Sequence, residues 1–136
     1  MGGHWAFAAS CALALTGCPT VDLGDNPPDI GLCNPAKGLD YFQSDIWPKM
    51  LHPSDTTKDC AKSGCHQGEH GLTLDATMPI DYARNYRVAQ GYLNCGQPMA
   101  SILLTKPMAG IDGHGGGDIF SMGDPVETTF LDWFMP

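Results

Sequence analysis

The stretch Lys58-Asp59-Cys60-Ala61-Lys62-Ser63-Gly64-Cys65-His66-Gln67-Gly68 places two cysteines directly before a histidine. The usual signal for covalent haem attachment is Cys-x-x-Cys-His, in which the thiols bond to haem vinyl groups and the histidine becomes an axial iron ligand. Here four residues separate the cysteines instead of two. Cysteines five positions apart do not share a helix face, so the backbone must loop to present both thiols, and Gly64 permits such a loop.

Two other interpretations of this motif stay open. Cys60 and Cys65 can close a small loop as a disulfide, or they can bind zinc together with His66 and a fourth ligand from elsewhere. A disulfide has no use for the adjacent histidine, and no second pair of zinc ligands occurs at a regular spacing. The motif therefore favours haem over both alternatives.

Residues 1–17 are expected to be a lipoprotein signal peptide. The apolar run from Trp5 to Leu15 is too short to cross a bilayer as a helix, and it has the character of a signal-peptide core. It leads into Leu15-Thr16-Gly17-Cys18, which resembles a bacterial lipobox, although no Lys or Arg precedes the run. We expect Cys18 to carry the lipid and to begin the mature chain; the alternative is ordinary secretion, with Cys18 paired elsewhere.

The charge and the cysteine count narrow the range of functions. The chain has 136 residues and a net charge of −8, so it is a poor candidate for nucleic-acid binding and suits a partner with a basic docking patch. Six cysteines in an exported chain indicate an oxidising compartment. Cys11 lies in the expected signal peptide, Cys18 is expected to carry the lipid, and Cys60 and Cys65 belong to the motif. Cys33 and Cys95 remain, and we predict that they form a disulfide.

The rest of the chain predicts a tether over residues 18–40 and a single domain over residues 41–136, built from short helices and long loops. The first helix is expected at 46–51, with Pro48 near its start. A second is expected to begin at the capping residues 54–57 and run into Cys60. Residues 81–93 form a weak helix or an irregular segment.

Two further helices are expected toward the C-terminus. The segment 98–106 reads as a helix with Ile102, Leu103 and Leu104 turned inward. A final helix begins at Asp124-Pro125-Val126-Glu127, where Asp caps, Pro takes the first helical position and Glu follows in the first turn. The apolar spacing of this last helix predicts that it packs on the first one.

The order of these pieces resembles the small cytochrome c-like domains of exported proteins and lipoproteins from planctomycetes and myxobacteria. The resemblance covers roughly residues 46–134, and its pieces stand in a specific order. They are Cys60-Ala61-Lys62-Ser63-Gly64-Cys65-His66, Gly71-Leu72-Thr73-Leu74-Asp75, Ala100-Ser101-Ile102-Leu103-Leu104-Thr105-Lys106-Pro107, His114-Gly115-Gly116-Gly117 and Phe130-Leu131-Asp132-Trp133-Phe134. The resemblance implies an all-α domain of a few short helices around one covalent haem c.

The same resemblance implies a ligand set. It gives Cys60 and Cys65 as thioether sites and His66 as the proximal iron ligand. The sixth ligand is expected to be His114, from the His-Gly-Gly-Gly piece, with Met108 and Met122 as alternatives because many c-type cytochromes use a methionine before the last helix. The widened cysteine spacing is the main departure from the usual pattern.

Arg84 and Arg87 are candidates for contact with the anionic haem propionates, since guanidinium groups pair well with carboxylates. The alternative is ordinary surface charge, which explains both residues equally well.

Three functions follow for testing. The first is a lipid-anchored monohaem cytochrome that carries single electrons between redox proteins of the cell envelope, in the periplasm or at the outer-membrane surface, and is not an enzyme. The second is a haemless binding or structural lipoprotein stapled by Cys60–Cys65 and Cys33–Cys95. The third is a peroxidase-like or gas-sensing haem protein, which requires that no side chain occupies the sixth iron position.

Overall fold

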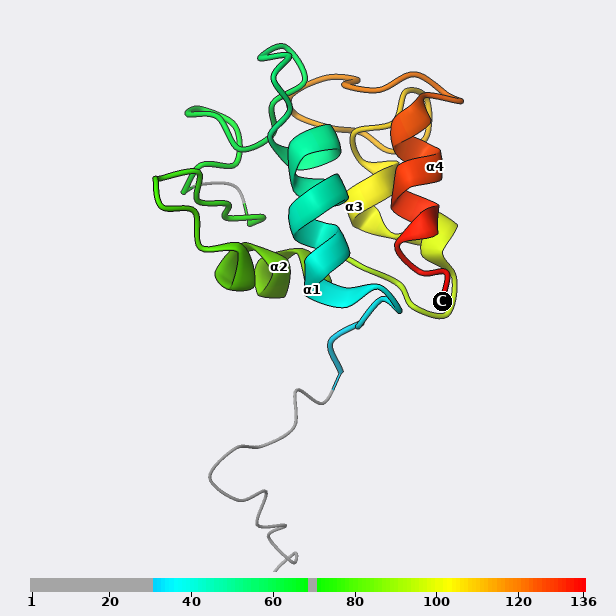
Figure 1. Ribbon diagram of the computed structural model, residues 1–136. Helices are drawn as coiled ribbons and strands as arrows, with labels where there is room; N and C mark the ends of the chain where they lie inside the picture. The colour runs from blue at the N-terminus through cyan, green and yellow to red at the C-terminus, as the bar shows by residue number, and fades with distance from the viewer. Residues whose placement is uncertain (1–30, 69–70) are drawn as a thin grey trace, which may run out of the picture. The chain divides into compact units, whose positions relative to one another are not determined.

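A computed structural model describes residues 31–68 and 71–136 of the chain. These residues form a compact unit that begins at Gly31 (Figure 1). The predicted signal peptide and the lipidation site Cys18 lie outside the described residues. In the described ranges, no helix combines the length and the apolar character that a bilayer crossing requires.

The described residues are all-α, as the sequence predicts, with long loops between short helices. The α-helices are α1 (Gly38–Tyr41), α2 (Tyr82–Gln90), α3 (Ile102–Thr105) and α4 (Pro125–Asp132). A π-helix, η1 (Phe42–Leu51), continues α1, and a 3₁₀ turn, η2 (Pro98–Ala100), precedes α3. Outside these helices, isolated parallel bridges join Gln67 to Leu74 and Met108 to Phe120, and the described part contains no strand.

The first helix is longer than predicted, and the prediction that Pro48 lies near its start is wrong. The helix begins at Gly38, and Pro48 lies inside η1. Proline has no N–H to donate and disrupts the i to i−4 pattern of an α-helix. Here the helix takes the wider π spacing instead, and its last bond runs from the His52 N–H to the Trp47 carbonyl at 2.7 Å.

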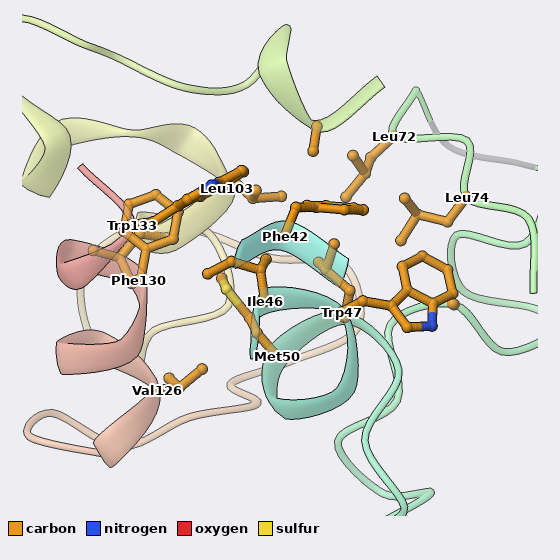
Figure 2. Close-up of a cluster of buried hydrophobic side chains, with 14 of the residues drawn as sticks. Phe42, Ile46, Trp47, Met50, Leu72, Leu74, Leu103, Val126, Phe130 and Trp133 are labelled. Carbon is orange, nitrogen blue, oxygen red and sulfur yellow. The ribbon is translucent and has the colours of Figure 1, made fainter. Parts of the chain in front are cut away.

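Helix α4 packs on the first helix, as its apolar pattern predicts. Asp124 caps it by accepting a bond from the Val126 N–H at 3.0 Å. At its far end the Trp133 indole N–H donates to the Gly38 carbonyl at 2.8 Å. Figures 1 and 2 show α4 beside η1, with the side chains of both helices meeting in the core. The bond from Trp133 to Gly38 joins the start of α1 to the end of α4.

A helix predicted to begin at residues 54–57 does not form; this segment consists of turns. The Asp55 carboxylate accepts bonds from the Thr57 N–H at 3.0 Å and from the Thr57 hydroxyl at 2.6 Å. Such a local turn competes with helix formation.

The prediction that Ile102 points inward is also wrong, since 52 % of that residue is exposed.

The N-terminal part of the compact unit is held against α2. Cys33 and Cys95 form a disulfide, and the Gln90 side-chain amide donates to the Cys33 carbonyl at 3.0 Å. Asp81 caps α2 by accepting a bond from the Arg84 N–H at 2.9 Å. Residues 31–40, which the sequence suggested as the end of a tether, therefore belong to the compact unit.

Candidate functional site

A cavity of about 570 Å³ lies between the cysteine motif and the glycine-rich loop. This volume falls within the usual range for small-molecule sites, about 300–1,000 Å³. Its apolar wall includes Met50, Leu72 and Leu103 from the core cluster of Figure 2. Its remaining lining residues are Leu51, Thr57, Asp59, Cys60, Lys62, Gly64, Cys65, His66, Tyr92, Ile102, Lys106, Pro107, Gly113, His114, Gly115, Gly116 and Ile119. Both motif cysteines and both candidate axial histidines are thus brought to one cavity.

The motif forms a closed loop rather than a helical turn. The His66 N–H donates to the Cys60 carbonyl at 3.0 Å, and the Cys65 N–H donates to the Lys62 carbonyl at 3.1 Å. Gly64 has φ +79°, in the left-handed region that glycine adopts without strain. This agrees with the expectation that Gly64 lets the backbone loop between the two cysteines.

His66 and His114 approach each other from separate loops. Their ring centroids are 5.9 Å apart, and the planes of the two rings differ by 18°. The His66 loop is tied to the neighbouring segment by the Leu74 N–H, which donates to the His66 carbonyl at 2.8 Å. This separation and near-parallel orientation are those of an ordinary stacked aromatic pair. Both side chains are imidazoles, which are common ligands of haem iron.

The glycine-rich loop fixes one particular form of the His114 ring. His114 Nδ1 lies 2.8 Å from the Gly117 carbonyl oxygen. Because a carbonyl only accepts, Nδ1 is the donor in this contact, and Nε2 is the ring nitrogen left to bind a metal. A Cβ atom on Gly116 would lie 3.2 Å from His114 Cε1. The absence of a side chain on Gly116 therefore lets the backbone of this loop lie close to the His114 ring.

The motif cysteines are free thiols, so the predicted alternative of a Cys60–Cys65 disulfide is not formed. Burial, reinforced by the Asp59 carboxylate, raises the pKa of Cys60 to about 12. The Cys60 thiol donates weakly to the Met50 carbonyl at 3.6 Å. No group of three or more His, Cys, Asp or Glu side chains that could hold a metal ion occurs among residues 31–68 and 71–136.

The two methionines proposed as alternative iron ligands lie elsewhere. Met108 is 1 % exposed and belongs to the hydrophobic core, while Met122 is 64 % exposed, and neither lines the cavity. Of the possible sixth ligands considered from sequence, His114 is the one that the fold brings opposite His66.

The candidate propionate contacts also lie away from the cavity. Arg84 and Arg87 do not line it, and the Arg84 guanidinium lies 3.8 Å from the Asp75 carboxylate. The cations that line it are Lys62 and Lys106, which sequence reasoning did not single out. The sequence offered one local indication that Lys62 lines the cavity, which is its position between the two motif cysteines.

Comparisons of the chain with protein-family models, with curated proteins and with solved structures gave no significant match.

Proposed function

We propose that this chain is a monohaem c-type cytochrome that carries single electrons in the cell envelope. The observation that supports this most strongly is that Cys60, Cys65, His66 and His114, selected from sequence, all line one largely apolar cavity although they come from two separate loops. A haem held there would supply an iron centre that exchanges single electrons between its ferric and ferrous states.

The residues of the cavity fit such a group. The two free thiols are available for thioether bonds to vinyl groups. His66 and His114 would supply two imidazole ligands, and the bond from His114 Nδ1 to the Gly117 carbonyl leaves Nε2 as the nitrogen that could bind iron. Leucine, isoleucine and methionine side chains provide the low-dielectric wall that tunes a redox potential.

Two histidine ligands favour a carrier over a catalyst. If His66 and His114 both bound the iron of a haem held in the cavity, no coordination site would remain for a substrate or a gas. Bis-histidine ligation also favours a lower potential than histidine–methionine ligation, because a thioether stabilises ferrous iron. Other redox proteins are therefore the expected partners, and a lipid at Cys18 would hold the carrier at the membrane.

The export part of this proposal is supported by the Cys33–Cys95 disulfide, which is a bond typical of oxidising compartments. An envelope location places the carrier where such a bond persists.

Covalent haem is tested by producing the full chain in a host that attaches haem c and measuring its intact mass after denaturation, together with a pyridine haemochrome spectrum. We expect the mass of one haem on the wild-type chain. The double variant Cys60→Ala/Cys65→Ala should lose the covalent haem, and a Met122→Ala control, at an exposed methionine away from the cavity, should keep it. A wild-type chain from that host without haem absorbance or added mass would contradict the proposal and favour a haemless scaffold.

A further inference from the structure

The cavity is lined by two lysines that differ from most other cations of the chain. The sequence holds 15 acidic residues and 7 Lys or Arg, so a basic group usually finds a carboxylate. Lys49, Lys58 and Arg84 each do so, with distances of 3.1 Å and 3.8 Å for the last two. Lys62 and Lys106 form no ion pair with any described residue, and both line the cavity.

Each of these lysines is held in place by a neutral acceptor. The Lys62 ammonium donates to the Thr56 carbonyl at 3.0 Å, and the Lys106 ammonium donates to the Gly113 carbonyl at 2.9 Å. An ammonium has three N–H donors, so each lysine keeps two for another partner.

Each lysine is also connected to one of the two loops that supply the histidines. Lys62 lies within the cysteine motif that carries His66, and Lys106 is bonded to the residue before His114. A ligand bound between the histidines would therefore have one cation near each of the two loops that supply them.

We propose that Lys62 and Lys106 bind the carboxylates of the cavity's ligand, which are the two propionates if the ligand is haem. The inference rests on the proposed haem function. It adds the residues that would bind the charged groups of the ligand to those that form the apolar wall of the cavity. An anionic ligand in the cavity would give these two ammonium groups the carboxylate partners that they do not have within the described protein. The cavity thus selects an apolar macrocycle with acidic substituents over a neutral one.

The test compares iron protoporphyrin with its dimethyl ester, in which both carboxylates are neutral. The full chain carrying Cys60→Ala/Cys65→Ala cannot form thioether bonds, so we expect it to bind either ligand reversibly, and absorbance titration then gives the dissociation constants. Adding Lys62→Gln/Lys106→Gln should weaken protoporphyrin binding by up to about tenfold, the combined effect of losing two solvent-exposed ion pairs. Binding of the ester should stay unchanged.

The control variant Lys37→Gln/Lys49→Gln removes the same net charge at positions that do not line the cavity. The inference is overturned if this control weakens protoporphyrin binding as much, or if the cavity variant weakens the ester equally. Failure of the wild-type chain to carry haem is a different result, since it contradicts the proposed function itself before any lysine is changed.

A second measurement uses the covalently loaded protein. The reduction potential should fall as pH rises through the carboxylate pKa, because an ionised carboxylate stabilises ferric iron. Removing the two ammonium groups raises that pKa, so the fall should move to higher pH in Lys62→Gln/Lys106→Gln and not in the control. An unchanged profile would overturn the inference.

Discussion

Removing the Cys33–Cys95 disulfide should cost about 4 kcal/mol of folding free energy. The bond joins residues 62 positions apart in the sequence. Closing a loop of that length in the unfolded chain removes an entropy of roughly 14 cal/mol/K, which is about 4 kcal/mol at 25 °C. Small domains are stable by about 5–15 kcal/mol, so this one bond supplies a large share of the stability of the fold.

The effect should come from the unfolded state, because other contacts hold the same segment in the folded protein. The Gln90 amide still bonds to the Cys33 carbonyl, and the Lys37 N–H still donates to the Trp133 carbonyl at 3.1 Å. The double variant Cys33→Ser/Cys95→Ser should therefore keep the helical circular dichroism of the wild type while its urea midpoint falls.

The assay is urea unfolding at 25 °C, with reduced wild-type protein as the chemical control for the double variant. Both proteins should lose the same free energy of unfolding relative to the oxidised wild type. Their m-values should be slightly larger, because the unfolded chain without the disulfide exposes more surface. A loss below about 1 kcal/mol would refute the loop-entropy reasoning. A loss accompanied by a smaller helical signal would show that the bond maintains the folded state instead.

Three further predictions concern the site and the last helix. Gly116→Ala should push the His114 ring by a few tenths of an ångström, since the new Cβ would lie 3.2 Å from the ring. This displacement should shift the reduction potential of the haem-loaded protein. The control Gly115→Ala, whose Cβ meets nothing within 4 Å, should leave the potential unchanged. Asp124→Ala should cost about 1 kcal/mol in urea unfolding at pH 7 through the lost cap. Because the amide bonded to its carboxylate lowers the pKa of Asp124, this difference should persist above the normal Asp range and vanish as pH falls through the folded pKa; a difference that grows in acid would contradict it. In the haem-free chain, the raised pKa of Cys60, about 12, should slow iodoacetamide labelling at pH 8 by roughly a thousandfold relative to the urea-unfolded chain, as read by mass spectrometry. The same shift predicts that stability falls as pH rises from the normal thiol range toward 12, and equal labelling in both states would exclude it.

The parts of the fold that could be predicted are those with strong local signals. The start of α4 followed from Asp124 and Pro125, a capping residue and a residue suited to the first turn. The same kind of signal misled at Pro48, because the helix adopts a π spacing there that no residue pattern announces. It misled again at Asp55, whose carboxylate bonds within a turn instead of capping a helix.

The candidate site was predictable in its members and not in its arrangement. Motif chemistry singled out His66, and the resemblance of the His-Gly-Gly-Gly piece singled out His114. Only the fold shows that their loops meet, since the sequence between them carries no signal of that contact. The choice of His114 over Met108 likewise depends on packing, because the methionine is drawn into the core. The two cavity lysines could not be distinguished from surface charges until their lack of carboxylate partners was visible.

The central claim is that His66 and His114 occupy both axial positions of one haem, and carbon monoxide binding to the dithionite-reduced protein tests it most directly. The wild type should not bind carbon monoxide at ordinary rates, and His114→Ala should bind it readily because an axial position opens. Met108→Leu, a volume-conserving change in the core, should behave as the wild type does. Rapid binding by the wild type, or a site opened by the change at Met108 and not at His114, would contradict the account.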